Sequence, residues 1–253
     1  MPSRGTVLVT GAGRRIGKAI ALDLAAHGYH VAIHANRSGA EAEAVAGLIR
    51  AEGGAADVFL ADLSQSSEVR RLHDEVSVRL GWPGIIVNNA SVFEDDDVRA
   101  FDEALFDRHF AIHLKAPLIL AEAMADGLPE RQDGLIVNII DQRVWKLTPR
   151  FFSYTLSKSA LWTANRTMAQ ALAPRIRVNA IGPGPTLANE RQDADDFARQ
   201  AAAVPLGRGP DLGEFGATIR YLHEARSVTG QMIALDGGQH LAWQTPDVTG
   251  VGE

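Results

Sequence analysis

A tyrosine and a lysine at helical spacing form the pair in this sequence best suited to proton chemistry. Tyr154 is the first and Lys158 the last residue of the stretch YTLSK, so a helix brings both side chains to one face. A nearby ammonium stabilises a phenolate, so Lys158 is expected to lower the pKa of Tyr154 and make it a proton donor near neutral pH. This spacing is common by chance, and its meaning depends on the residues placed beside it.

A glycine-rich turn near the start of the chain is typical of a phosphate-binding site. The stretch TGAGRRIG, residues 10–17, directly follows a short apolar run and precedes an amphipathic segment. Glycines let the backbone approach a pyrophosphate, which the amides and dipole of the helix N-terminus favour. A tight strand-to-helix connection is the simpler interpretation, but the strand–turn–helix context favours a nucleotide site.

The residues after the second apolar run discriminate between nicotinamide cofactors. An Asp or Glu at this position would accept hydrogen bonds from the ribose 2′-hydroxyl of NAD and repel a 2′-phosphate. The chain has HANRS at residues 34–38, in which Arg37 offers a charged planar fork and Asn36 and Ser38 offer neutral donors. With a second guanidinium from Arg15, the site is expected to bind NADPH. The alternative is that Arg14, Arg15 and Arg37 are solvated surface charges.

The elements that must position these residues alternate along nearly the whole chain. Short runs rich in Val and Ile alternate with segments of helical period, which predicts one doubly wound α/β domain of the Rossmann type over residues 1–253, with helices on both faces of a parallel sheet. The seven predicted strands are Thr6–Thr10, His30–Ala35, Ala56–Leu60, Gly84–Asn88, Leu135–Ile140, Arg177–Ile181 and Met232–Leu235. The predicted helices are Ile16–His27, Gly39–Glu52, Ser66–Leu80, Phe101–Leu128, Ser153–Leu172 and Leu212–Glu224.

One segment interrupts the alternation. Residues 182–209 begin with GPGP, carry an acidic stretch around Asp193–Asp196 and end with PLGRGP. A long irregular insertion after a late strand is more often functional than accidental, so we expect a substrate lid here.

Composition excludes several classes of function. The 253 residues are 46% hydrophobic and 22% charged, with no cysteine, so disulfides, iron–sulfur clusters and thiolate zinc sites are excluded and a cytoplasmic location is expected. The net charge of −6 with scattered basic residues argues against a nucleic-acid partner. No apolar run reaches the length that spans a bilayer, and no secretory leader is recognisable, so no membrane partner is expected.

The motifs form an ordered set that resembles the short-chain dehydrogenase/reductase family over essentially the whole chain. The set comprises the glycine turn, Asp62 in ADLS, the NNA stretch at 88–90, the Tyr154/Lys158 pair and the PG dipeptide at 183–184. The resemblance implies hydride transfer from the cofactor to a substrate carbon, with Tyr154 delivering the proton and Lys158 holding the nicotinamide ribose. It also implies a homotetramer assembled through the helices at 101–128 and 153–172.

The resemblance further implies a set of residues that contact the cofactor. They are Gly11, Arg14, Arg15, Ile16, Gly17, His34, Asn36, Arg37, Ser38, Asp62, Leu63, Asn89, Ala90, Ser91, Lys158, Pro183 and Gly184.

Three departures from the family pattern narrow the substrate. Arg15 replaces the middle glycine of the turn, Asp141 replaces the usual catalytic serine and His113 replaces a helix asparagine. The first two are similar to pteridine reductases, a branch of the family that also has an NNAS stretch followed two residues later by an aromatic residue, here Phe93. The resemblance implies that a pterin stacks between Phe93 and the nicotinamide. The residues implied to contact the substrate are Ser91, Phe93, Asp141, Tyr154 and Leu187.

The chemistry of Asp141 supports a substrate with N–H groups. Serine donates a hydrogen bond to a carbonyl oxygen, whereas an ionised carboxylate only accepts and repels a developing oxyanion. A pterin offers N–H groups and a reducible C=N bond. Alternatively, a desolvated Asp141 is protonated and shares proton delivery with Tyr154. The simpler interpretation is a turn residue that caps local amides.

Three further side chains leave alternatives open. His113 and His109 form an i, i+4 pair, but no third ligand is set by spacing, so no metal site is expected, and His113 is expected to take part in catalysis as a proton relay. Phe93 is equally compatible with a core position at a strand end. Arg143 is compatible with pairing either to Asp141 or to an acidic substrate.

The sequence therefore predicts an NADPH-dependent reductase of a C=N bond in a dihydropterin or dihydrofolate. Two alternatives remain: a carbonyl reductase acting on a sugar, a steroid or a 3-oxoacyl thioester, and an NADPH-binding sensor with weak or no catalysis.

Overall fold

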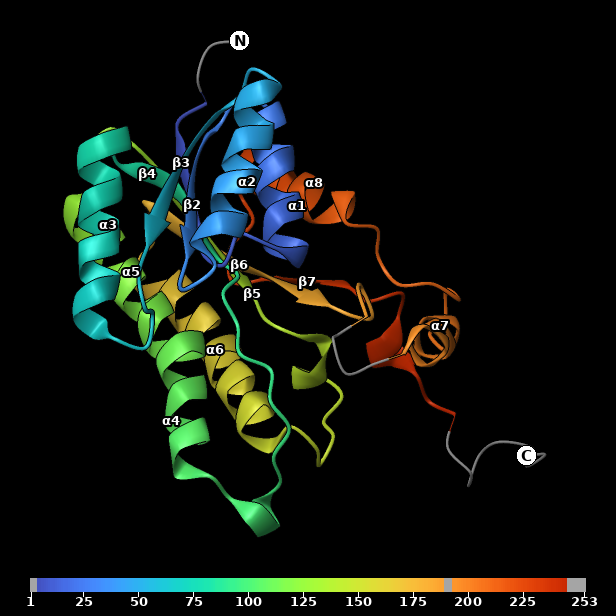
Figure 1. The fold of residues 1–253 in the computed structure, drawn as a ribbon. Helices are drawn as coiled ribbons and strands as arrows, with labels where there is room; N and C mark the ends of the chain where they lie inside the picture. Colours follow the sequence, from blue (N-terminus) through green and yellow to red (C-terminus); the bar gives the residue numbers. More distant parts are fainter. Residues whose placement is uncertain (1–3, 189–192, 245–253) are drawn as a thin grey trace.

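The centre of the molecule is a parallel β-sheet. The computed structural model describes residues 4–188 and 193–244, and within them seven strands pair in the order β3-β2-β1-β4-β5-β6-β7 (Figure 1). The strands are β1 (Thr6–Val9), β2 (His30–Ala35), β3 (Ala55–Leu60), β4 (Pro83–Asn88), β5 (Gly134–Ile139), β6 (Ile176–Pro183) and β7 (Met232–Leu235). All seven predicted strands are confirmed, with ends that differ by at most two residues.

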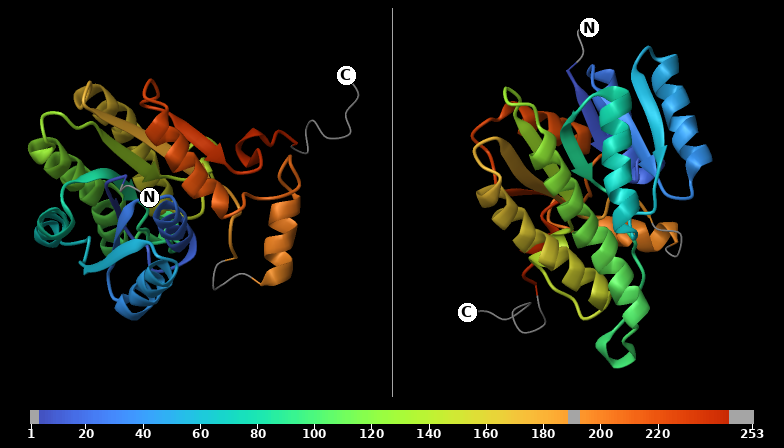
Figure 2. Two further views of the ribbon diagram at one scale, coloured as in Figure 1. Left: turned by 90° about the horizontal axis from the view of Figure 1, so that it is seen from above. Right: turned by 90° about the vertical axis from the view of Figure 1, so that its left-hand side faces the viewer.

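Helices cover both faces of the sheet (Figures 1 and 2). One face packs against α1 (Arg15–Ala26), α2 (Gly39–Ala51) and α8 (Gly213–Glu224); the other packs against α3 (Ser66–Leu80), α5 (Ala116–Gly127) and α6 (Phe152–Ala171). The central strands are buried on both sides, which explains why they read as continuous apolar runs. Among the described helices, none combines the length and apolar character needed to cross a bilayer.

The predicted helix at 101–128 is interrupted in the structure. A short helix, α4 (Glu103–Phe110), begins after Asp102, whose side chain caps the amide of Leu105 at 3.0 Å, and a π-helical turn at Ala111–Lys115 separates α4 from α5. Pro117 has no amide to donate to the carbonyl four residues earlier, so an ordinary α-helical turn cannot close there. The predicted helical stretch is confirmed over residues 103–127, but it contains a π turn that the sequence did not indicate, and His113 lies at the middle of that turn.

The segment predicted as an irregular lid contains a helix. β6 extends to Pro183, and α7 (Ala194–Ala202) occupies part of residues 182–209. The side chain of Asp193 accepts a hydrogen bond from the amide of Asp196 at 2.6 Å, so the acidic stretch is the cap and first turn of α7 rather than loop. Residues 189–192 of the predicted lid lie outside the described residues.

A chain of buried asparagines ties the middle of the sheet to α6. Asn88 on β4 donates to Asn138 on β5 at 2.8 Å, and Asn138 donates to Asn165 on α6 at 2.9 Å. All three side chains are buried, so each amide depends on its neighbour to satisfy its polar atoms.

Removal of the central member should destabilise the protein strongly. Asn138→Ala leaves the Asn88 amide donor and the Asn165 carbonyl without partners, at an expected cost of about 2–4 kcal/mol in the free energy of unfolding. Denaturant unfolding measures this difference, with Asn36→Ala, an exposed asparagine, as the control. A loss of no more than the control shows would contradict the role assigned to this chain.

Candidate active site

The predicted chemical residues gather at the carboxyl ends of the central strands. Asp141 follows β5, Tyr154 and Lys158 lie on the first turns of α6, and the glycine turn follows β1. The strand order reverses between β1 and β4, and ligands of open parallel sheets bind at such a point.

Tyr154 and Asp141 form a directly hydrogen-bonded pair. The Tyr154 hydroxyl donates to Oδ2 of Asp141 at 2.9 Å, and the backbone amide of Arg143 donates to Oδ1 at 2.8 Å. Burial raises the pKa of the Asp141 carboxyl above its ordinary value. Burial and the neighbouring carboxylate raise the pKa of the Tyr154 phenol well above its usual range. A phenol with so high a pKa is a weak acid, whereas a raised pKa brings the carboxyl closer to the range in which it can supply a proton to its neighbour.

Lys158 does not act on Tyr154 as the sequence suggested. Its ammonium donates to the carbonyl of Ile139 at 2.8 Å and lies 5.7 Å from the centroid of the Tyr154 ring. Burial lowers the pKa of Lys158 to about 8. The expectation that Lys158 lowers the pKa of Tyr154 was wrong, because the burial of the phenol and its contact with Asp141 dominate.

His113 connects the loop after β4 to α6. Its Nε2 accepts from the amide of Val92 at 3.1 Å and lies 2.9 Å from the Ser91 hydroxyl, so Nδ1 carries the proton. Nδ1 lies 2.8 Å from Oγ of Ser157 and donates to it, and that hydroxyl donates to the carbonyl of Tyr154 at 2.7 Å. Burial and the charge of Lys158 hold the pKa of His113 well below its usual value, so the ring is neutral.

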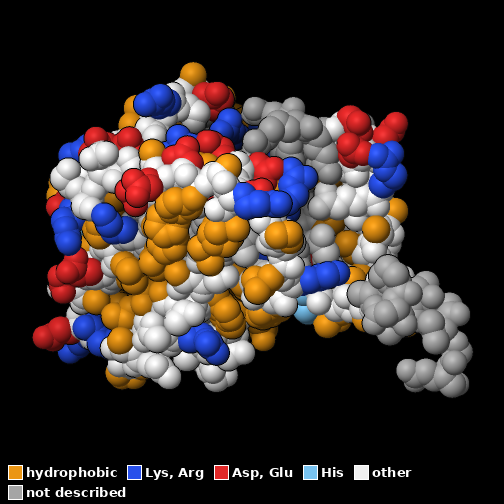
Figure 3. Space-filling view, turned by 90° about the horizontal axis from the view of Figure 1, so that it is seen from below, with side chains coloured by type: hydrophobic (Ala, Val, Ile, Leu, Met, Phe, Trp, Pro, Cys, Tyr) orange, Lys and Arg blue, Asp and Glu red, His pale blue; other side chains and the backbone are white. Residues whose placement is uncertain are grey.

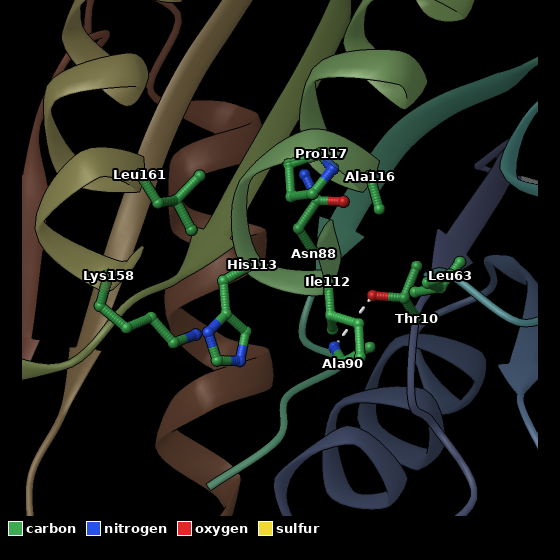
Figure 4. Close-up of a pocket in the computed structure, with 10 residues that line it drawn as sticks. All are labelled: Thr10, Leu63, Asn88, Ala90, Ile112, His113, Ala116, Pro117, Lys158 and Leu161. Carbon is green, nitrogen blue, oxygen red and sulfur yellow. Dashed lines mark hydrogen bonds between the residues drawn. The ribbon is translucent and has the colours of Figure 1, made fainter. Parts of the chain in front are cut away.

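A small cavity lies behind this group. Figure 4 shows the side chain of Lys158 extending toward the His113 ring beside it. The cavity has a volume of about 10 Å³, about the size of one water molecule, and is lined by Thr10, Leu63, Asn88, Ala90, Ile112, His113, Ala116, Pro117, Lys158 and Leu161. Leu63 and Ala90, expected at the cofactor, both border this cavity.

Thr10 and Asn89 join the glycine turn to the loop after β4. The Thr10 hydroxyl accepts from the amides of Asn89 and Ala90 at 2.9 and 3.0 Å. The Asn89 side chain donates to the carbonyls of Thr10 and Gly11 at 2.8 and 3.0 Å. Asn89 therefore shapes the turn from behind and has its amide occupied by the protein.

His34 supports the turn from the opposite side. Its Nδ1 accepts from the amide of Gly11 at 3.1 Å, and its Nε2 lies 3.0 Å from the carbonyl of Ala61. The ring is buried, so His34, expected among the cofactor contacts, is placed as a support of the turn. A Cβ at Gly17 would lie 2.2 Å from the Gly11 carbonyl oxygen, so only glycine allows the turn to close against α1. Ile16 follows as a partly buried residue of α1.

The end of β2 presents Asn36 and Arg37 to solvent, with Ser38 partly exposed beside them. Asp62, one strand away, is fixed by the amide of Ser64 at 2.9 Å, and this bond lowers the pKa of its carboxyl. The charge of Arg37 also lowers the pKa of the Asp62 carboxyl, so these two side chains lie near each other.

Arg15 lies elsewhere. Its guanidinium donates to the carbonyls of Leu187 and Ala188 at 3.0 and 2.7 Å, in the segment after β6. In the strand order β1 separates β2 from β4, β5 and β6, so these bonds direct Arg15 away from Arg37. The guanidinium expected at the phosphate beside Arg37 therefore has partners in the segment after β6. Arg14, its neighbour, is exposed on the turn.

The PG dipeptide lies at the carboxyl end of β6, beside β7. The amide of Gly184 donates to the carbonyl of Leu235 at 2.9 Å, and a Cβ there would lie 2.6 Å from Cα of Asp236. Pro183 is the last residue of β6. The dipeptide is thereby pressed against the end of β7.

Phe93 belongs to an aromatic group over the proton-donating pair. Its ring stacks on Phe151 at 4.2 Å and 9° and meets Tyr154 edge to face at 4.8 Å. Phe151 has a φ of +56°, a left-handed conformation that non-glycine residues rarely adopt. The Arg143 guanidinium lies 5.3 Å from the centroid of Phe93 and 4.9 Å from that of Phe151. Phe93 therefore faces the site and not the core.

Several residues of this site were not found from the sequence. Ser157 and the supporting role of His34 depend on contacts between distant segments, and no local pattern indicates them. For Phe151, by contrast, the aromatic type and the place beside Tyr154 already suggest either a flat pocket or packing under the lid, and the structure stacks it on Phe93. Within the described ranges, no group of three or more His, Asp or Glu side chains is placed to hold a metal ion.

Similarity to known proteins extends over most of the chain. The model described as short chain dehydrogenase matches residues 5–198. The 3-oxoacyl-[acyl-carrier-protein] reductase FabG of Staphylococcus epidermidis is 30% identical over 242 residues, covering 93% of this chain and 99% of the relative. An uncharacterised oxidoreductase of Methylorubrum extorquens is 33% identical, covering 91% and 96%.

Solved structures give a higher identity. The FolM alternative dihydrofolate reductase 1 of Brucella canis, complexed with NADP, is 64% identical with a TM-score of 0.95 and covers 98% of this chain and 99% of that chain. The corresponding Brucella suis protein, also in complex with NADP, gives the same identity and TM-score, covering 98% and 100%. The family-model match over residues 5–198, with the fold and the ordered motifs, leads to one conclusion: this chain belongs to the short-chain dehydrogenase family.

Proposed function

We propose that this protein is an NADPH-dependent reductase that transfers hydride to the C=N bond of a dihydropterin or dihydrofolate. The observation that carries the proposal is the buried contact of 2.9 Å between the Tyr154 hydroxyl and the Asp141 carboxyl. A carboxylic acid in the position of the usual serine suits protonation of a ring nitrogen better than stabilisation of an oxyanion. The 64% identity to NADP-complexed dihydrofolate reductases of the FolM type supports it.

The glycine turn and the end of β2 would hold the cofactor. The turn at 11–17 has no room for a Cβ at Gly17 and opens the N-terminus of α1, which fits a pyrophosphate. Arg37 and Ser38, with no carboxylate at the end of β2, would receive the 2′-phosphate. When bound, NADPH supplies the hydride. Ser91, Pro183 and Gly184 would border the nicotinamide end.

Asp141 and Tyr154 would deliver the proton. Burial raises the pKa of Asp141, which makes its carboxyl a better relay than an ordinary carboxylate, and a proton taken up there can be passed to the phenol after Tyr154 donates to the substrate nitrogen. Lys158, held by the Ile139 carbonyl, would bond the nicotinamide ribose and keep a positive charge beside the phenol. His113 would position the loop carrying Ser91 and Phe93, a role that differs from the expected relay.

Phe93 would stack on the planar ring of the substrate, with Leu187 closing the pocket from the segment after β6. A pterin ring presents two faces, so one aromatic side chain and the nicotinamide can hold it between them. The sandwich would align its C=N bond with the hydride and with Tyr154.

We also propose that four chains assemble through α5 and α6 in the cytoplasm. Leu118 on α5 and Leu156 on α6 are exposed, and Figure 3 shows hydrophobic side chains gathered on the face seen from below. A cysteine-free composition fits a reducing compartment.

The enzymatic proposal predicts oxidation of NADPH in the presence of dihydrofolate or dihydrobiopterin. Tyr154→Phe should lower kcat by about 10²–10⁴-fold, the range for loss of a positioned proton donor, and Asp141→Asn should also lower it. The decrease in absorbance at 340 nm measures turnover, with Glu94→Gln, an exposed carboxyl, as the control.

A specific observation favours one competitor, a 3-oxoacyl reductase: the 30% identity to FabG. Asp141→Ser separates the two functions, because a carbonyl reductase tolerates or gains from serine whereas a pterin reductase loses activity. Wild-type turnover of 3-oxoacyl thioesters without turnover of any dihydropterin would refute the proposed substrate class.

The activity should fall on the alkaline side. The pKa of Lys158 is lowered to about 8, so its proton is lost earlier than from an ordinary lysine as the pH rises. If the ammonium is required, kcat/KM decreases about tenfold per pH unit above that value. Lys158→Arg keeps its charge, so its residual activity should lack this decrease. A wild-type profile that is flat to pH 10 would contradict the assignment.

Sedimentation velocity tests the assembly. A species of four times the chain mass is expected, and Leu156→Lys should shift it to smaller species by placing a charge in the interface. A monomer at micromolar concentration would exclude the tetramer.

A further inference from the structure

We propose that Arg143 recognises an anionic side chain on the substrate, such as the glutamate carboxylates of a folate, and so determines specificity among pterins. This inference rests on the proposed function. Arg143 is half-buried at the edge of the site, and its guanidinium lies over the stacked rings of Phe93 and Phe151 at 5.3 and 4.9 Å.

The backbone of Arg143 is held by Asp141, the residue proposed to restore the proton of Tyr154. Its amide bonds to Oδ1 of Asp141 at 2.8 Å, within the short 3₁₀ turn Gln142–Val144 that Asp141 caps. The charge therefore stays close to the reacting end of the site. Among the described residues, no carboxylate lies within ion-pair distance of this guanidinium, although cations at protein surfaces commonly find one.

Arg150 shows what a purely structural arginine looks like at the same place. Its guanidinium also lies over Phe151, at 5.5 Å, but it forms an ion pair with Asp95, and its side chain is 71% exposed. Arg143 has the same aromatic support, is less exposed and has no such pair. The N–H donors of Arg143 are thus held beside the stacked rings of Phe93 and Phe151, here called the aromatic platform, and are available to a ligand.

The chemistry of the fork favours a carboxylate. Guanidinium N–H groups form paired, charge-assisted hydrogen bonds with a carboxylate. A pterin ring stacked on Phe93 would lie next to this fork, which would be within reach of a substituent on that ring. Dihydrofolate carries carboxylates on that substituent, whereas the side chain of dihydrobiopterin is neutral, so Arg143 should distinguish the two.

The test compares two substrates in matched variants. Arg143→Met should raise KM for dihydrofolate about tenfold or more, as expected for loss of a charge-assisted hydrogen bond, and leave KM for dihydrobiopterin nearly unchanged. Arg143 also lowers the pKa of Asp141 and Tyr154 by its charge, so kcat can change for both substrates. The ratio of the two kcat/KM values cancels that common effect. Arg143→Lys should recover part of the ratio, and Arg150→Met should not alter it.

The outcomes separate this inference from the function on which it rests. A wild-type enzyme that reduces dihydrobiopterin but not dihydrofolate, or an unchanged ratio in Arg143→Met, overturns the inference alone. If neither substrate is reduced, the proposed function fails. The inference about Arg143 is then tested by calorimetry, which measures the affinity of the NADP⁺-loaded protein for folate and for biopterin. Recognition of the anion is supported if Arg143→Met weakens the binding of folate and not that of biopterin. It is overturned if the variant weakens both equally, if it weakens neither, or if the wild type does not bind folate.

Discussion

The contact between the Tyr154 hydroxyl and the Asp141 carboxyl is the constraint around which the rest of the site is built. Both groups are acids, and burial raises the pKa of each. The Asp141 carboxylate raises the pKa of the phenol further, whereas the hydrogen bond from Tyr154 offsets part of the shift on Asp141. The pair exists only if the end of β5 and the first turn of α6 are held at a fixed separation. Buried hydrogen bonds hold these two segments at that separation.

Three buried contacts fix α6, two of them to β5 and one to the π turn. Asn165 accepts from Asn138 on β5, Ser157 accepts from His113 in the π turn, and Lys158 donates to the carbonyl of Ile139. Apolar packing alone would allow small shifts of the helix along its axis. Hydrogen bonds between buried groups do not, because a shift leaves donors and acceptors unpaired in a medium of low dielectric.

The fold could be predicted because its signals are local. Val- and Ile-rich runs mark strands buried on both faces, and the order of the motifs places the site at their carboxyl ends. The π turn at 111–115 could not be predicted, since helical periodicity continues through it and Pro117 alone indicates a break. The direction of the pKa shift of Tyr154 and the contacts of Arg15 depend on which segments meet, and no spacing in the sequence reports that.

The neutral imidazole of His113 has a consequence for how the site responds to its surroundings. A salt bridge in the same place would weaken when either partner lost its charge, and the loop would move relative to the helix. His113 instead joins the amide of Val92 to Ser157 through an uncharged ring whose pKa is far below its usual value. Because the pKa of His113 is lowered, Nε2 remains an acceptor for the Val92 amide at an acidity that would protonate an ordinary histidine, and the link between the loop after β4 and α6 is kept.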